Sequence, residues 1–188
     1  NFLGLADNIV IGGAMANTFL TANGYNMGKS LVEMDKLKIA KRILLDASKT
    51  KTKIILPIDF NGELDEFGSG SLKYANYDDI KKNMICEDIG ELSVNLFSDI
   101  ISESKTIFWN GTVGVAENKD FAFGTEKIID KIIENECIAI AGGGDTITAI
   151  RNYDSELIDK LSHASTGGGA CLELLSGRKL PAIEILDK

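Results

Sequence analysis

The stretch CIAIAGGGD, residues 137–145, carries the clearest structural information in the sequence. Small and apolar residues are followed at once by three glycines and an aspartate. Such a run is typical of a buried strand that ends in a tight loop and leads into a helix. Because a helical pattern follows from Asp145 to Asn152, the stretch predicts one strand–loop–helix unit of an α/β protein.

Similar units recur along the 188 residues of the chain. Hydrophobic patterns predict strands at 8–12, 53–58, 105–109 and 137–141, and helices at 14–22, 31–47, 92–104, 121–136, 145–152, 155–160 and 168–175. Strands that alternate with helices imply crossover connections between parallel strands. The predicted fold class is therefore α/β, a three-layer, Rossmann-like parallel sheet with helices on both faces. Residues 59–83 lack this periodicity and are interpreted as a long surface excursion, a hairpin being one form it could take.

Composition excludes several classes of function. The net charge of -8 argues against nucleic-acid binding, which needs a basic face to displace counterions. Three scattered cysteines without a CxxC pair, and a single histidine, do not form a zinc pattern. Free thiols fit a reducing, cytoplasmic location. No apolar run approaches the roughly 20 residues needed to cross a membrane. The chain starts without an initiator methionine or a signal peptide, so we expect it to be a piece of a longer protein.

Glycines are concentrated where predicted strands end. Because the carboxyl ends of parallel strands share one edge of a sheet, we expect these loops to converge there and to form a ligand site. Glycine lets backbone N–H groups approach phosphate oxygens, and the helix that follows adds a partial positive charge. The predicted anion or nucleotide site comprises four loops: Gly12-Gly13, Asn110-Gly111, Gly142-Gly143-Gly144-Asp145 and Thr166-Gly167-Gly168-Gly169.

Single polar residues near these loops leave alternatives open. Asp145 has the sequence position of a helix N-cap and also the chemistry of a magnesium ligand beside phosphate oxygens. Glu117 is either a solvated loop carboxylate or an acceptor for ribose hydroxyls. Residues 24–30 resemble a P-loop but have one residue too few between the glycines and follow a helix. No GxGxxG motif follows the first strand.

Four collinear segments resemble the phosphoglycerate kinase family, in a bacterial style. The stretch 109–117, WNGTVGVAE, is similar to the family's WNGPxGVFE loop, and 142–146, GGGDT, to its GGGDT/S loop. The stretch 162–170, SHASTGGGA, with the later Leu180-Pro181, is similar to its SHxSTGGGAxLE…LP tail. The opening GGAMANTF at 12–19 also fits. By this resemblance, residues 1–188 are the C-terminal nucleotide-binding domain.

The resemblance implies a role for each matched residue. Gly12 and Gly13 would border the adenine, Val115 would pack on the base and Glu117 would hold the ribose. Asn110, Thr146 and the 142–144 glycines would approach the phosphates, and Asp145 would take Mg²⁺ bound with ADP or ATP. Thr166 and the catalytic glycines Gly167, Gly168 and Gly169 would face the phosphoryl group in transfer, where charge stabilisation dominates.

The resemblance also implies what lies outside this chain. A domain that binds 1,3-bisphosphoglycerate and 3-phosphoglycerate, and the family's GAKVxDK segment, would precede Asn1. We therefore expect the chain to bind Mg-nucleotide weakly, to be inactive alone as a glycolytic kinase, and to be monomeric. Thr112 stands where the family usually has proline and Ala116 where it usually has phenylalanine. The alternatives are an NAD-dependent oxidoreductase domain and a non-catalytic nucleotide-binding or interaction module.

Overall fold

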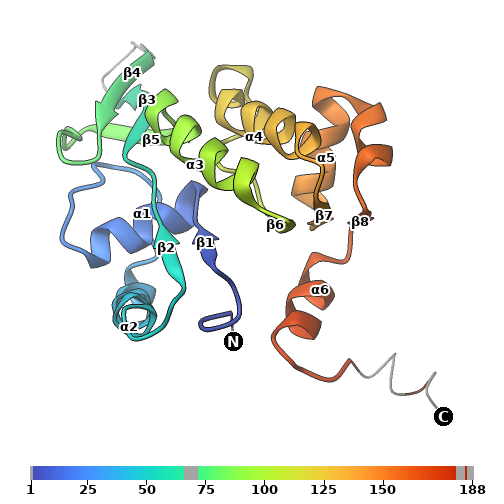
Figure 1. Ribbon diagram of the computed structural model, residues 1–188. Helices are drawn as coiled ribbons and strands as arrows, with labels where there is room; N and C mark the ends of the chain where they lie inside the picture. Colours follow the sequence, from blue (N-terminus) through green and yellow to red (C-terminus); the bar gives the residue numbers. More distant parts are fainter. Residues whose placement is uncertain (1, 66–71, 181–184, 186–188) are drawn as a thin grey trace.

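The computed structural model describes residues 2–65, 72–180 and 185 as a series of strands and helices (Figure 1). Pro181, in the last predicted motif, lies outside these residues. The strands are β1 (Asn8–Val10), β2 (Lys53–Ile55), β3 (Asp59–Leu64), β4 (Leu72–Asn76), β5 (Met84–Ile89), β6 (Thr106–Asn110), β7 (Ile138–Gly142) and β8 (His163–Ser165). The α-helices are α1 (Gly13–Ala22), α2 (Leu37–Ala47), α3 (Glu91–Glu103), α4 (Phe123–Glu134), α5 (Gly144–Tyr153) and α6 (Gly168–Leu175). Short 3₁₀ helices are η1 (Met34–Lys36), η2 (Lys119–Phe121) and η3 (Ser155–Lys160).

Parallel strands form the centre of the molecule. β1 pairs with β2, and β7 lies between β6 and β8, all in parallel. The chain passes through α4 between β6 and β7 and through α5 between β7 and β8. These are the crossover units that the sequence pattern predicts, and they place the carboxyl ends of β6, β7 and β8 at one edge.

Helices cover both faces of the parallel strands. Ile54 of β2 packs against the cluster built by α1 and α2, whereas its neighbour Ile55 packs against the cluster built by α3 and α4. Consecutive strand residues point to opposite faces, so the two helix pairs lie on opposite sides. The predicted three-layer α/β class is confirmed. Phe97 of α3, which is fully buried, lies in the larger of these clusters.

Within 59–83, the described residues 59–64 and 72–76 form strands. The segment begins with β3, whose Asp59 and Phe60 are buried, and it continues into an antiparallel hairpin with β4. The surface interpretation is therefore wrong for its first residues, while the hairpin is confirmed. β5, which the pattern analysis did not predict, pairs antiparallel with the other side of β3. Phe60 and Met84 anchor this sheet in a core that also includes Leu20 of α1.

One extra residue interrupts the pairing of β5 with β3. Asn61 lies opposite Asp88 and the next residue, Gly62, lies opposite Cys86, so Glu87 has no partner on β3. A bulge of this kind bends the strand and turns its backbone groups out of the ladder. Gly62 is required there, because a methyl group at this position would overlap the Ile85 carbonyl.

The predicted helix over 31–47 begins later than expected. Residues 31–33 have no regular secondary structure, η1 follows, and α2 starts at Leu37. Two hydrogen bonds to α1 hold this start: Asn17 Nδ2 donates to Leu31 O at 3.3 Å, and Glu33 N donates to Thr18 Oγ1 at 3.1 Å. Side-chain groups of α1 thus satisfy the Leu31 carbonyl, which a longer helix would have bonded internally, and the Glu33 N–H.

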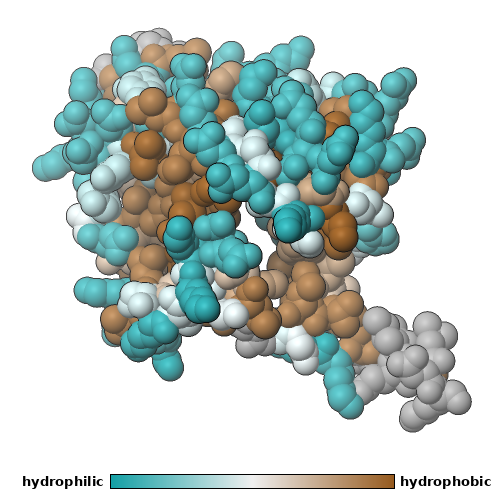
Figure 2. Space-filling model, in the orientation of Figure 1, coloured by the Kyte–Doolittle hydropathy of each residue, from teal (hydrophilic) through white to brown (hydrophobic). Residues whose placement is uncertain are grey.

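The last helix, α6, extends away from the body of the molecule at the lower right of Figure 1. Its leucines Leu172, Leu174 and Leu175 are 39%, 52% and 40% exposed, and Gly168 is its one buried residue within the described chain. Figure 2 shows apolar side chains on the surface in the same region. Within the described residues, no helix combines the length and apolarity needed to cross a membrane.

Candidate functional site

The four glycine loops meet, as predicted. Each loop is joined to the next by a short contact. Three hydrogen bonds make these connections: Gly13 N to Val113 O at 3.1 Å, Gly111 N to Thr146 Oγ1 at 2.7 Å, and Gly143 N to Ser165 O at 2.9 Å. The first joins the loop after β1 to the loop after β6, the second joins β6 to α5, and the third joins the loops after β7 and β8. The result is one continuous rim of glycine backbone.

Close backbone approach requires glycine at two points of this rim. A methyl group added at Gly168 would lie 2.5 Å from Gly143 Cα and 2.8 Å from Gly143 N. One added at Gly12 would lie 2.6 Å from Val113 Cγ1. Gly143 itself has φ of +99°, a left-handed conformation that favours glycine. By contrast, methyl groups at Gly144 and Gly169 would meet nothing within 4 Å, so these residues border open space.

Asn110 lies at the centre of the rim. It is the last residue of β6 and is exposed. Its Nδ2 atom is the nearest neighbour of methyl positions built at Gly142 and Gly143, at 3.3 and 3.1 Å, and lies 2.9 Å from one built at Gly168. The side-chain amide therefore faces the glycine loops after β7 and β8, where it could donate to an anion.

Three of the four glycine loops lead directly into an α-helix. α1, α5 and α6 start at Gly13, Gly144 and Gly168, directly after their strands and loops. The loop after β6 is different, because residues 111–118 separate it from η2; the expectation that all four loops open a helix is wrong for this one. Three helices therefore begin along the rim, and the N–H groups of a helix's first turn, which have no partner within the helix, attract anions.

Asp145 and Thr146 follow the first residue of α5. Asp145 is exposed in the first turn, and the N-cap is Gly143 with no side-chain cap, so the interpretation of Asp145 as a cap is wrong. Thr146 is completely buried, and its hydroxyl accepts the Gly111 N–H. No cluster of three acidic, histidine or cysteine residues that could hold a metal occurs in the described residues. Asp145 fits a hard cation only with further oxygen ligands from a bound phosphate.

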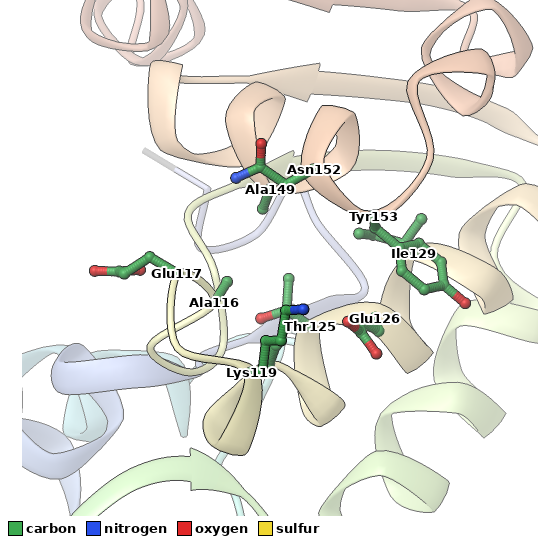
Figure 3. Close-up of a pocket in the computed structure, with 10 residues that line it drawn as sticks. Ala116, Glu117, Lys119, Thr125, Glu126, Ile129, Ala149, Asn152 and Tyr153 are labelled. Atoms are coloured by element: carbon green, nitrogen blue, oxygen red, sulfur yellow. The ribbon is translucent and has the colours of Figure 1, made fainter.

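Val115 and Glu117 lie on the segment after β6. Val115 N donates to Glu87 O at 2.8 Å, which fixes the segment to the bulge of β5. Glu117 is exposed, and its side chain extends away from Glu126 and Tyr153 in Figure 3. A hollow of about 300 Å³ lies behind this segment, lined among others by Thr125, Ile129 and Tyr153.

That hollow is separate from the glycine rim. Asn152 and Tyr153, which line it, are at the last turn of α5, whereas Gly144 and Asp145 are at the first. Ten helical residues span roughly 15 Å. The hollow therefore lies toward the last turn of α5, beside Ala116 and Glu117, and none of the glycines of the rim lines it.

Asp88 is the functional candidate that pattern analysis missed. The side chain is 2% exposed at the end of β5. Burial raises the pKa of Asp88 to about 7, and the backbone donors Gly124 N and Ile89 N, which favour the ionised form, only partly oppose this rise. Asp88-Ile89-Gly90 also fits the family resemblance, but no sequence pattern indicated the role of Asp88, because its partners are 36 residues away in the sequence or belong to its immediate neighbour.

Comparison with known proteins identifies the family. The family model described as phosphoglycerate kinase matches residues 1–178. The chain belongs to the phosphoglycerate kinase family. Phosphoglycerate kinases from Finegoldia magna and Helicobacter pylori are each 43% identical over 188 residues, covering 100% of this chain but 47% and 46% of those proteins. Membership of this family sets aside the alternative of an NAD-dependent oxidoreductase.

Solved structures agree with this assignment. The structure of phosphoglycerate kinase from Coxiella burnetii matches with a TM-score of 0.91 at 35% identity, covering 98% of this chain and 47% of that one. Phosphoglycerate kinase from Pyrococcus horikoshii OT3 matches with a TM-score of 0.82 at 29% identity, covering 97% and 45%. The chain thus spans about half the length of the phosphoglycerate kinases that it matches.

Proposed function

We propose that this chain is the C-terminal, nucleotide-binding half of a phosphoglycerate kinase. The convergence of four glycine loops and three helix N-termini at one rim carries the proposal. An acidic chain can hold a polyphosphate only where local backbone donors outweigh its overall charge, and this rim is such a place. The reaction would be reversible phosphoryl transfer between 1,3-bisphosphoglycerate and ADP, giving 3-phosphoglycerate and ATP.

Within this proposal, different rim residues contact the base, the ribose and the phosphates of the nucleotide. Gly12, Gly13 and Val115 border the base, and Glu117 accepts from the ribose hydroxyls. Asn110 donates to the phosphates together with the N–H groups at the start of α5. Asp145 would hold Mg²⁺ jointly with phosphate oxygens, and the cation would neutralise part of their charge.

The phosphoryl group in transfer would face the start of α6. The N–H groups of Gly167, Gly168 and Gly169, with the Thr166 hydroxyl, would stabilise its negative charge without a protein nucleophile. Gly169 borders open space, as a residue that approaches a ligand should. Thr146, beside the phosphates in this proposal, also positions the loop after Asn110, because its hydroxyl accepts from Gly111 N.

The other half of the enzyme would bring the phosphoglycerate. The chain spans about half the length of its relatives, and α6 exposes Leu172, Leu174 and Leu175. We propose that the phosphoglycerate-binding half covers this apolar helix in a monomeric, cytoplasmic enzyme, consistent with the free cysteines Cys86 and Cys137. This chain alone would bind nucleotide weakly and would not turn over.

Calorimetric titration with Mg-ADP tests the proposal. We expect magnesium-dependent binding by the parent chain, at least tenfold weaker in Asp145→Ala because the cation loses its carboxylate ligand. Asp99→Ala, which removes an exposed carboxylate from the middle of α3, should bind as the parent does. Absence of binding by a parent chain that shows a cooperative thermal melt would refute the nucleotide site.

A further inference from the structure

The segment 114–124 carries two residues of the proposed site, Val115 and Glu117, and it is attached to β5 at both ends. Val115 N donates to Glu87 O at 2.8 Å near its start, and Gly124 N donates to Asp88 Oδ2 at 2.7 Å at its end. Two consecutive residues of one strand therefore hold the two ends of the segment.

The Asp88 carboxylate also packs directly on both glycines of the segment. A methyl group at either Gly114 or Gly124 would overlap Asp88 Oδ1. The carboxylate itself is held in place, because Oδ1 accepts the N–H of Ile89 at 2.9 Å and the residue is 2% exposed. These contacts make the buried carboxylate a clamp that draws the two ends of the segment together.

The bulge in β5 makes the second attachment possible. In a regular antiparallel ladder the carbonyl groups of successive residues point alternately toward neighbouring strands. Glu87 has no partner on β3, and its carbonyl accepts from Val115 instead. The bulge of β5 and the buried Asp88 thus both hold the segment 114–124 in place.

The part of the segment around Glu117, residues 117–120, is exposed, whereas Phe121 and Ala122 near its end are buried. Ala116, Glu117 and Lys119 line the hollow of about 300 Å³ behind it. Three further backbone hydrogen bonds are internal to the segment: Asn118 N donates to Val115 O at 2.9 Å, Ala116 N to Gly114 O at 3.0 Å and Phe121 N to Asn118 O at 2.9 Å. With open space behind it, the direction of the Glu117 side chain depends on how firmly the two ends are held.

We propose that Asp88 is a positioning residue for ribose recognition: its carboxylate clamps Gly114 and Gly124 and thereby holds Glu117 against the ribose hydroxyls. The proposal rests on the proposed nucleotide site. Asp88 itself is buried behind the segment and does not touch the nucleotide. Its loss should therefore weaken the recognition of the ribose selectively, while base and phosphate contacts persist.

The test compares Mg-ADP with Mg-2′,3′-dideoxy-ADP, which lacks the ribose hydroxyls. Titrations at pH 8, where Asp88 is mainly ionised, give the ratio of the two dissociation constants. In the parent chain the ratio should be roughly tenfold, the value of a hydrogen bond to a charged group. In Asp88→Asn, whose amide offers only one oxygen for two N–H donors, it should fall close to one, as it should in Glu117→Gln.

A matched control separates positioning from loss of stability. Asp59 is also completely buried and accepts the backbone N–H groups of Leu92 and Ser93, but it caps α3 instead of the segment. Asp59→Asn should lower stability and leave the ratio unchanged. If Asp88→Asn does not fold, Gly124→Ala carries the test, because alanine suits the helical backbone there while its methyl group presses on the Asp88 carboxylate and on Ile89.

The outcomes separate failure of the proposed nucleotide site from failure of the proposed role of Asp88. If the folded parent binds neither nucleotide, the proposed function fails and this proposal fails with it. Another outcome is that the parent binds Mg-ADP more tightly than the dideoxy nucleotide while folded Asp88→Asn or Gly124→Ala keeps the full ratio, with or without an equal loss of affinity for both nucleotides. In that case the positioning role is refuted and the nucleotide site stands. A ratio near one in these variants, with normal binding of the dideoxy nucleotide, supports the clamp.

Discussion

The pKa of Asp88 makes stability depend on pH in a direction opposite to most carboxylates. The carboxyl group is buried in the fold, with a pKa raised from 3.8 to about 7. In the unfolded chain it ionises near 4. Between these values the folded state holds a proton that the unfolded state has released. Stability therefore falls as pH rises through this window, and the penalty is complete above pH 7.

The expected size follows from the shift. About three units at roughly 1.4 kcal/mol each give a difference on the order of 4 kcal/mol between pH 4 and pH 8. This is a large part of the 5–15 kcal/mol, roughly, that stabilises a typical domain. Asp88→Asn replaces the titrating group by a neutral one, so the stability of the parent relative to this variant should decline across the same range.

Urea unfolding followed by circular dichroism at pH 5, 6, 7 and 8 measures this difference. Comparing parent with Asp88→Asn cancels the general effect of the net charge of -8, which both chains share apart from this group. We expect the parent to lose roughly 2–3 kcal/mol relative to the variant between pH 5 and pH 8. A difference that stays constant, or that moves in favour of the parent as pH rises, would refute the reasoning.

Three further predictions concern the rim and the core. Gly168→Ala should lower the melting temperature and reduce Mg-ADP affinity in calorimetry, since its methyl group would press on Gly143, whereas Gly169→Ala, with nothing within 4 Å, should leave the melting temperature nearly unchanged. Thr146→Val should cost about 1–3 kcal/mol in urea unfolding, because it leaves Gly111 N without its acceptor, and an unchanged midpoint would contradict that role. Phe97→Ala should cost about 3–5 kcal/mol in the same assay, since the ring is fully buried between α3 and α4; a loss below about 1 kcal/mol would mean that the core collapses around the gap.

Local patterns were enough to predict most of the parallel core and the convergence of the glycine loops at one edge. β7 and α5 follow directly from residues 137–152, and α6 was predicted with the bounds that it has. Apolar runs form strands and glycines end them through forces that act within a few residues, so the sequence reports them. The edge at which the loops converge then follows from the geometry of parallel strands.

The rest depended on contacts between distant residues. β5 was missed because its sequence, MICEDI, alternates poorly, and its strand form comes from pairing with β3, some 25 residues earlier. Side chains of α1 hold the irregular start at 31–33, and Gly143, not Asp145, is the N-cap because α5 begins at Gly144. The Asp88 clamp, in the same way, exists only once β5 and α4 are packed together. Local propensity and spacing thus determined the parallel units and the glycine rim. Tertiary packing decided the antiparallel sheet, its bulge and the buried carboxylate, because burial and long-range hydrogen bonds depend on residues far away in the sequence.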